Sequence, residues 1–280
     1  MNPKKTYPIV LSIAGSDSSG GAGIQADLKT FSALGVYGAT AITAITAQNT
    51  LGVHAQCPIP PEMVYDQITA VVDDLHPSFV KIGMLSNAEI VLAVAEALGK
   101  YSLPIVLDPV MVSSSGHRLL SVEAQELVKK KLLPMAMLIT PNLPEMKALT
   151  ELPLSTYEEK EKAAKHLMEY GAQAILLKGG HEEGDIKTDI LFSPSANGIQ
   201  SSLFASDSIP TRNIHGTGCT LSSAIAAYLA KGLCLEEAIA AAKKYISEAI
   251  RAGADIEIGH GFGPVNHGFN PLKMQVHVNP

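Results

Sequence analysis

The sequence predicts an α/β fold in which helices cover both faces of a mostly parallel central sheet. Short apolar runs alternate with longer amphipathic segments along nearly the whole chain. Most of the apolar runs end in a polar or glycine-rich motif, as strands do at the ligand-binding edge of such a sheet. The 280 residues contain no repeat, low-complexity tract or linker, so we expect a single domain over residues 1–280.

Hydrophobic periodicity separates the expected strands from the expected helices. The strand candidates are Ile9–Ala14, Ala39–Ala47, Ser78–Ile82, Pro104–Leu107, Met135–Thr140, Ala174–Leu177, Lys187–Phe192 and Gln200–Ala205. The last two flank a Ser/Asn/Gly turn, which predicts a pair of antiparallel edge strands. The helix candidates are Ile24–Leu34, Met63–Leu75, Ala88–Leu98, Val122–Leu132, Tyr157–Tyr170, Thr220–Ala230 and Leu235–Ala252. Several of them carry apolar residues on one face and end at glycine.

Composition narrows the class of protein. Hydrophobic residues make up 46% of the chain and charged residues 17%, which favours a large core and argues against disorder. The 21 basic and 27 acidic residues give a net charge of −6 without a basic run, so we expect no nucleic-acid partner. The three cysteines, Cys57, Cys219 and Cys234, are widely spaced and form no C-x-x-C motif. We therefore expect reduced thiols in the cytoplasm, with no signal peptide, bilayer-spanning segment or membrane partner.

The motif of greatest chemical interest runs from Asn213 to Thr220 and leads into a helix. Gly216 and Gly218 allow a tight turn, and the unpaired N–H groups of the helix start favour an anion such as phosphate. Cys219 lies at this helix start, where the helix field should lower the pKa of its thiol and let it accept a proton from a hydroxyl. The alternatives are an ordinary glycine turn and a small cysteine that only packs.

A second glycine-rich loop, Gly15–Gly23, follows the first expected strand. It lacks the Gly-Lys-Ser/Thr ending of a Walker A motif. Asp17 and Asp27 beside it are either ligand contacts or helix-capping and surface acids. Gln48 follows the next expected strand, and its carboxamide can pair with the edge of an aminopyrimidine or can satisfy loop backbone instead.

Three further motifs follow strands. Asn142 and Glu145 stand three residues apart at a helix start, where they can hold hydrated Mg²⁺ or act as an N-cap and a first-turn acid. Lys178, before two glycines, is either a phosphate contact or a surface lysine. Asp108 ends another strand, and the small residues Val112–Gly116 after it are suited to a lid. Because these strand ends share one edge of the sheet, we expect the motifs to converge.

Taken together, the motifs resemble those of the hydroxymethylpyrimidine/phosphomethylpyrimidine kinases of thiamine biosynthesis, members of the ribokinase-like superfamily. The resemblance covers nearly the whole chain and rests on Ala14-Gly15-Ser16-Asp17-Ser18-Ser19-Gly20-Gly21-Ala22-Gly23-Ile24-Gln25-Ala26-Asp27, Thr46-Ala47-Gln48-Asn49-Thr50, Lys81-Ile82-Gly83-Met84, Thr140-Pro141-Asn142-Leu143-Pro144-Glu145, Lys178-Gly179-Gly180-His181 and His215-Gly216-Thr217-Gly218-Cys219-Thr220.

The resemblance implies a single ribokinase-like kinase domain that uses ATP and Mg²⁺ and forms a homodimer. It implies phosphorylation of the pyrimidine alcohol 4-amino-5-hydroxymethyl-2-methylpyrimidine and then of its monophosphate. Carried over by position, the implied catalytic base is Cys219, with Gly216, Thr217 and Gly218 as the anion hole. The implied substrate contacts are Gln48, Asp27, Met84 and Gly15. The implied contacts to ATP are Lys178, Asn142, Glu145 and Asp108, with Asp108 and Glu145 also near the metal.

Two other functions remain open at this point. Some pyridoxal kinases of the same superfamily also carry a cysteine at the position of Cys219, and they have a second cysteine in the lid. The segment Met111–His117 contains no cysteine, which favours the pyrimidine substrate. A non-catalytic effector-binding module is the other alternative, and the presence of Cys219, Lys178 and the Asn142/Glu145 pair argues against it.

Overall fold

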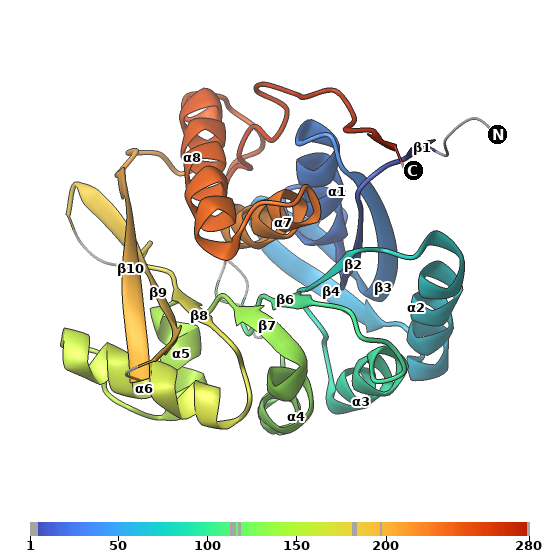
Figure 1. Cartoon of the computed structure of the whole chain (residues 1–280). Coiled ribbons are helices and arrows are strands. Elements are labelled where there is room, and N and C mark those ends of the chain that lie inside the picture. Colours follow the sequence, from blue (N-terminus) through green and yellow to red (C-terminus); the bar gives the residue numbers. More distant parts are fainter. Residues whose placement is uncertain (1–4, 113–115, 117–118, 181–183, 197, 279–280) are drawn as a thin grey trace.

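The computed structural model describes residues 5–112, 116, 119–180, 184–196 and 198–278. Within these residues, a nine-stranded sheet with the strand order β10-β9-β8-β7-β6-β5-β2-β3-β4 forms the middle of the molecule (Figure 1). Its strands are β2 (Ile9–Asp17), β3 (Tyr37–Asn49), β4 (Gly52–Pro58), β5 (Phe79–Ile82), β6 (Ile105–Leu107), β7 (Ala136–Ile139), β8 (Ile175–Leu177), β9 (Ile186–Ser195) and β10 (Gly198–Asp207). A small separate pair joins β1 (Lys5–Thr6) to β11 (His277–Val278) near the two chain ends.

The strands from β3 through β2 and β5 to β8 run parallel. At the edges, β4 pairs antiparallel with β3, β9 pairs antiparallel with β8, and β10 pairs antiparallel with β9. The predicted α/β class with a mostly parallel central sheet is confirmed. The sequence did not reveal β4, because this edge strand is polar and exposed over much of its length and lacks the apolar signal of a buried strand.

Helices cover both faces of the sheet (Figure 1). One face carries α1 (Gly23–Ala33), α7 (Thr217–Ala230) and α8 (Leu235–Gly253). The other carries α2 (Pro61–Leu75), α3 (Ala88–Leu98), α4 (Val122–Leu127), α5 (Leu143–Thr150) and α6 (Tyr157–Glu169). Successive strand residues point to opposite faces. In β2, Leu11 and Ile13 therefore join the core under α2 and α3, and Val10 joins the core under α1, α7 and α8.

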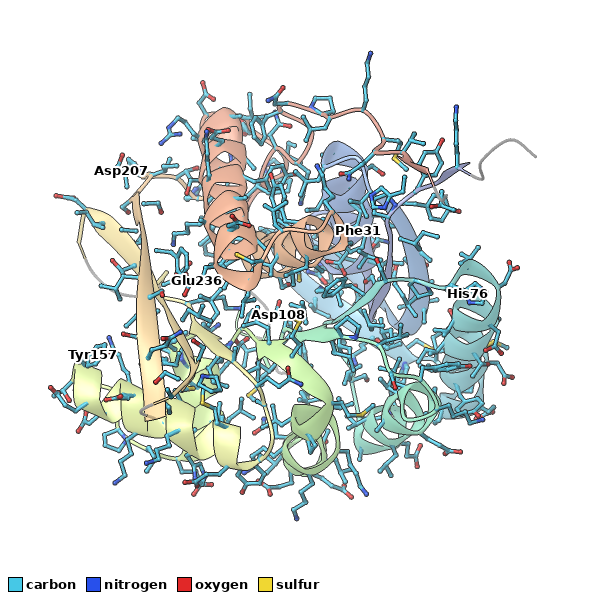
Figure 2. The ribbon with its side chains drawn as sticks, in the orientation of Figure 1. Phe31, His76, Asp108, Tyr157, Asp207 and Glu236 are labelled. Carbon is cyan, nitrogen blue, oxygen red and sulfur yellow. The ribbon has the colours of Figure 1, made fainter. Side chains whose placement is uncertain are left out.

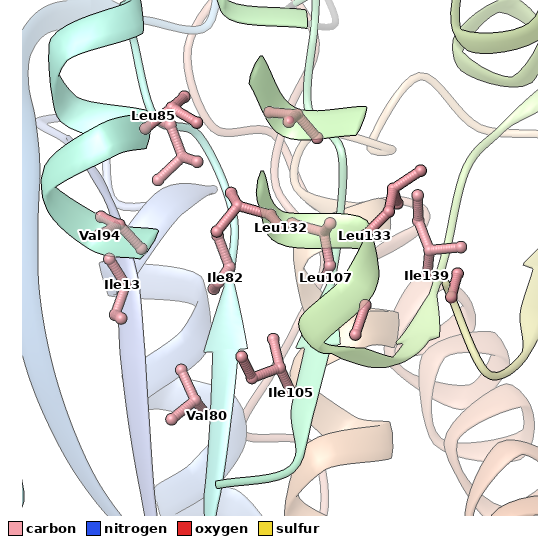
Figure 3. Packing of buried hydrophobic residues seen from close by; sticks show 14 of the residues in the cluster. Ile13, Val80, Ile82, Leu85, Val94, Ile105, Leu107, Leu132, Leu133 and Ile139 are labelled. Carbon is pink, nitrogen blue, oxygen red and sulfur yellow. The ribbon is translucent and has the colours of Figure 1, made fainter. Parts of the chain in front are cut away.

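Branched and long aliphatic side chains fill the core on the α2–α6 side. Figure 3 shows Ile13, Ile82, Leu107 and Ile139, one from each of four neighbouring strands, packed against helical residues that include Val94 and Leu132. All six are at most 1% exposed. Such apolar strands, buried on both faces, fix the register of the sheet, because a shift of one residue would exchange the two faces.

Two helix boundaries differ from the sequence prediction. The helix expected over Val122–Leu132 is α-helical only to Leu127 and continues as a π-helical turn over Val128–Leu132. The helix expected from Thr220 begins three residues earlier, at Thr217, so Cys219 lies within its first turn. No helix in the described part of the chain has both the length and the apolar character needed to cross a bilayer.

The strand order places a ligand crevice at a defined point. The chain adds β3 on one side of β2 and then crosses to add β5 on the other side. Open parallel sheets bind ligands beyond the carboxyl ends of strands at such a reversal. The residues that follow or end these strands here, Gly15–Asp17 on β2 and Gly83–Met84 after β5, are therefore the floor of the expected site.

Candidate active site

A cavity of about 680 Å³ lies along the carboxyl edge of the sheet, a size typical of small-molecule sites. The polar motifs that we expected to converge meet there, since the cavity is lined by Gly15, Gln48, Met84, Asp108, Asn142, Glu145, Lys178, Gly216, Thr217, Gly218 and Cys219. Of the expected lid, residues 113–115 lie outside the described residues, and Val112 just before them lines the cavity.

The glycine loop at the start of α7 has the geometry of an anion site. Gly216 has a φ of +80°, and a Cβ built on it would stand 1.8 Å from the Gly21 carbonyl oxygen, so no larger residue fits. Thr220 N–H makes the first bond of α7, to the Gly216 carbonyl at 2.8 Å, whereas Thr217 N–H donates to Ile214. The N–H groups of Gly218 and Cys219 therefore precede the hydrogen-bonded helix and add to the positive end of its dipole.

Cys219 is partly exposed to the cavity, beside this loop. Burial raises the pKa of its thiol to about 11, although Lys81 lowers it, and Asp27 and Asp108 raise it further. The prediction of a lowered thiol pKa from the helix position is therefore wrong. The field of a helix start is a local effect, and the loss of water around the sulfur outweighs it here.

Lys178 lies between two carboxylates at the end of β8. Its Nζ is 2.8 Å from Asp108 Oδ1 and 3.7 Å from Glu145 Oε2. Burial opposes the charge of Lys178, but Asp108 and Glu145 hold its pKa above the usual value. Asp108 lies below α7 in the view of Figure 2 and also accepts hydrogen bonds from Thr140 and Ser222. The Lys178 ammonium thus borders the glycine loop, because its Nζ lies 3.3 Å from a Cβ built on Gly218.

Asn142 and Glu145 form the N-terminal capping box of α5. The Asn142 side chain accepts from Glu145 N–H at 2.8 Å, and the Glu145 carboxylate accepts from Asn142 N–H at 2.7 Å. Asn142 is therefore the N-cap of α5 and Glu145 its first-turn acid, and both residues also line the cavity. Burial and the neighbouring Asp108 raise the pKa of Glu145 to about 7 in spite of Lys178.

A network around Asp17 connects the first glycine loop to the anion loop. Asp17 accepts hydrogen bonds from the backbone N–H groups of Ser19, Gly21 and Ala22, and its Oδ2 lies 2.8 Å from His215 Nε2. Burial would raise the pKa of Asp17, but these partners hold it below its usual value. Asp17 is neither the N-cap of α1, which is Ala22, nor a surface acid, because its buried carboxylate holds the glycine loop and lines the cavity.

His215 was not singled out from the sequence, although it stands directly before Gly216 in the motif. Its Nε2 is also 3.4 Å from Gln48 Nε2, while Thr46 donates to Gln48 Oε1 at 3.1 Å. The bond from Thr46 thus holds the carboxamide oxygen of Gln48 at the cavity wall, while His215 Nε2 donates to the ionised Asp17. The cavity lining also includes a second pair that the sequence did not indicate, Lys243 and Asp189, with 2.8 Å between Nζ and Oδ2.

Asp27 does not lie where we expected it. It is fully buried and absent from the cavity lining, so the expectation that it lines the substrate pocket is wrong. Its carboxylate instead pairs with Lys81 at 2.9 Å and accepts hydrogen bonds from Ser12 and Ser223. Asp27 lies one helical turn after cavity-lining Gly23 on the same face of α1, so its carboxylate is one turn deeper, in the protein interior below the cavity.

Comparison with known proteins places this site in a family. A family model described as phosphomethylpyrimidine kinase matches residues 17–266. The chain belongs to the phosphomethylpyrimidine kinase family. This membership makes it a phosphotransferase, and the alternative of a non-catalytic effector-binding module is therefore wrong.

Individual proteins and solved structures that are similar to this chain support the family assignment. A hydroxymethylpyrimidine/phosphomethylpyrimidine kinase of Rhizobium meliloti is 52% identical over 260 residues, which cover 92% of this chain and 96% of that protein. The crystal structure of the phosphomethylpyrimidine kinase of Clostridium difficile is similar with 46% identity and a TM-score of 0.75, over 86% of this chain and 99% of that one. An ADP complex of Bacillus subtilis pyridoxal kinase is similar with 37% identity and a TM-score of 0.85, over 94% and 98% of the chains.

Proposed function

We propose that the protein transfers the γ-phosphoryl group of ATP to the hydroxymethyl group of 4-amino-5-hydroxymethyl-2-methylpyrimidine, and then a second phosphoryl group to the monophosphate. The observation that carries the proposal is that one cavity brings together an anion loop, a thiol, a paired lysine and a carboxamide. These are the parts needed to hold a phosphoryl donor and an aminopyrimidine alcohol in contact. The whole chain, residues 1–280, acts as one kinase domain in this proposal.

The anion loop stabilises the transferred phosphoryl group. Negative charge spreads over the phosphoryl oxygens in the transition state, and the main-chain N–H groups of Gly218 and Cys219 offer fixed dipoles near that charge, whereas Thr217 N–H donates to Ile214. Lys178 adds a positive charge that Asp108 and Glu145 keep in place. Because these groups are already oriented in the protein, little reorganisation is needed during the reaction.

Cys219 acts as the proton acceptor for the attacking hydroxyl. The thiolate form of Cys219 carries this step. As the oxygen–phosphorus bond to the substrate forms, the bond from the γ-phosphorus to the leaving ADP oxygen breaks, and the hydroxyl proton moves to the thiolate sulfur, which becomes the thiol and later releases its proton to water. Because the pKa is about 11, the thiolate is a minor species near neutral pH, and the reaction runs through that small fraction. A loose transition state needs the hydroxyl proton removed only late.

Gln48 recognises the pyrimidine edge. Its carboxamide offers a donor and an acceptor side by side, and the hydrogen bond from Thr46 fixes its orientation at the cavity wall. Gly15 and Met84 form the apolar surface beside it, and the absence of a side chain at Gly15 leaves room for the Met84 sulfur, 2.8 Å from a built Cβ. The pyrimidine ring packs on this surface.

ATP is the phosphoryl donor, with Lys178, Asn142, Glu145 and Asp108 on its phosphates. The carboxylates of Asp108 and Glu145 fit a Mg²⁺ ion, because both line the cavity on either side of Lys178 and their repulsion contributes to the raised pKa of Glu145. When bound, the ion supplies positive charge to the phosphate oxygens. Among the described residues no cluster of three metal-binding side chains occurs, which suits an ion that uses few protein ligands.

The protein acts in the cytoplasm as a homodimer in this proposal, which follows from the resemblance to its family. Sedimentation at micromolar concentration tests the oligomeric state, and a monomer would contradict it.

Pyridoxal kinase is the second candidate function. The supporting observation is that the Bacillus subtilis pyridoxal kinase covers 94% of this chain with a TM-score of 0.85. The experiment that separates the two is release of ADP with the pyrimidine alcohol and with pyridoxal, measured side by side on the same preparation. A higher kcat/KM for the pyrimidine alcohol supports the main proposal, and a higher value for pyridoxal reverses it.

A further inference from the structure

Lys81 is a fully buried cation just behind the wall of the cavity. It lies on β5, its exposure is 0%, and its Nζ is 2.9 Å from each oxygen of Asp27. Removing an ammonium group from water is strongly unfavourable unless it is paired. Replacing such an ion pair by apolar side chains of similar volume is often neutral or stabilising, so folding alone does not account for it.

Asp27 has all its hydrogen-bonding capacity in use. Besides the two bonds from Lys81, it accepts one from Ser12 and one from Ser223, both at 2.6 Å, and a carboxylate has about four acceptor positions. An ammonium carries three protons, two of which Lys81 directs to Asp27. The pair is therefore held rigidly by strands β2 and β5 and helices α1 and α7.

This pair is hydrogen-bonded to α7 one helical turn after Cys219. Ser223, which binds Asp27, is one helical turn after Cys219 on α7, so both residues occupy the same side of that helix. Lys81 Nζ is 2.9 Å from a Cβ built on Gly83, the residue before cavity-lining Met84. The charges of Lys81 and Asp27 thus act on the sulfur through the protein interior, where water screens them little.

We propose that Lys81 and Asp27 set the proton affinity of the Cys219 sulfur in opposite directions, Lys81 favouring the thiolate and Asp27 the thiol. The inference rests on the proposed function, in which Cys219 accepts the hydroxyl proton. Lys81 is a positioning residue in this scheme, because it acts only through Cys219. The other charged groups that act on the sulfur are Asp108, which follows β6, and Lys178, which follows β8.

The direction of each effect agrees with the electrostatics of the site. The positive charge of Lys81 lowers the pKa of Cys219, and Asp27 raises it to a smaller extent. Conversely, Asp27 and Cys219 both help to hold the pKa of Lys81 above its usual value against the effect of burial. The sulfur and the ammonium are therefore coupled.

The test measures the reactivity of the Cys219 thiol itself and does not need kinase turnover. The exposed Cys57 and Cys234 are first changed to serine, and the hydroxyl introduced by Cys234→Ser can keep the capping position at the start of α8. The rate of alkylation by iodoacetamide is then followed from pH 7 to 10, because only the thiolate reacts. The variants compared on this background are Lys81→Met, Asp27→Asn and the double variant Asp27→Asn/Lys81→Met.

Below the pKa of the thiol, the alkylation rate at a given pH is proportional to the small thiolate fraction, so a rise of one unit in that pKa slows the reaction about tenfold. Lys81→Met should therefore slow alkylation about tenfold or more, and Asp27→Asn should accelerate it. If Lys81→Met does not fold, the double variant, which leaves no unpaired charge, should still react more slowly than the unchanged background. Changes of the same sign in the two single variants, or an unchanged rate in the double variant, overturn the proposal.

Lys243→Met is the matched control. Lys243 belongs to a second Lys–Asp pair, with Asp189, and is not among the charged groups that act on the sulfur, so it tests the general effect of breaking such a pair. The alkylation rate of Cys219 in the Lys243→Met variant should match the rate in the background protein. The experiment also separates this inference from the proposed function: normal turnover of Cys219→Ala would remove the base role, whereas the alkylation rates would still report whether Lys81 and Asp27 tune the sulfur.

Discussion

Gly216 is the residue whose replacement tests the anion loop most directly. In Gly216→Ala the new methyl group would stand 1.8 Å from the Gly21 carbonyl oxygen and 3.2 Å from Ala22 Cα. Real Cβ atoms essentially never come within 3.0 Å of another heavy atom, so the two backbone segments must move apart by more than an ångström. The residue would also keep a φ near +80°, which alanine adopts at a cost of about 1–2 kcal/mol.

The displacement should affect turnover more than folding. A misplacement of about 1 Å in a reacting group can cost about 100-fold in rate, which corresponds to about 2.7 kcal/mol in the activation free energy. We therefore expect Gly216→Ala to lower kcat/KM at least about 100-fold with the pyrimidine alcohol, whereas the free energy of unfolding falls by only a few kcal/mol.

The measurements are steady-state ADP release and urea denaturation, with Gly232→Ala as the control. Gly232 also has a positive φ, +94°, but a Cβ built on it has no neighbour within 4 Å and it lies between α7 and α8, away from the cavity. Gly232→Ala should lose stability through its φ alone and keep its turnover. Equal turnover in the two variants would refute the assignment of Gly216 to the anion loop.

Three further predictions concern single side chains. Cys219→Ala should lose about 100-fold or more in kcat with unchanged ATP affinity, because a general base contributes at least that much; near-normal turnover, with Cys234→Ser as control, would remove the base role. Gln48→Ala should weaken binding of the pyrimidine alcohol by about 1–3 kcal/mol in calorimetry, since its amide would pair inside the cavity; unchanged affinity argues against that pairing. Burial lowers the pKa of His267 to about 4 from 6.5, so its contribution is complete above pH 6.5 and the free energy of unfolding should drop by about 3 kcal/mol as the pH falls from 6.5 to 4. His267→Gln should flatten this part of the pH profile in urea denaturation, and an unaltered profile would show that another group is responsible.

Much of the architecture could be read from the chain before the structure was known. The apolar runs that became β2, β5, β6, β7 and β8 are buried on both faces, and continuous apolar character is what such strands require. The edge strand β4 escaped detection because it buries little, so its sequence carries no comparable pattern.

The convergence of the site was also predictable, for a topological reason. Gln48, Asp108, Asn142 and Lys178 each follow or end a strand, and parallel strands all end at the same edge of the sheet. A strand ending can be recognised locally, so residues up to 130 positions apart could be assigned to one cavity without any knowledge of their contacts.

By itself, then, the sequence determined the fold class, the strand endings that meet at one edge and the glycines that form the anion loop. Only the tertiary structure decided that Asp27 is buried below the cavity and pairs with Lys81, that His215 contacts Asp17, and that the thiol of Cys219 has a raised pKa. The physical reason is that strand and turn formation depend on neighbouring residues, whereas desolvation and charge pairing depend on which distant segments enclose a group after folding.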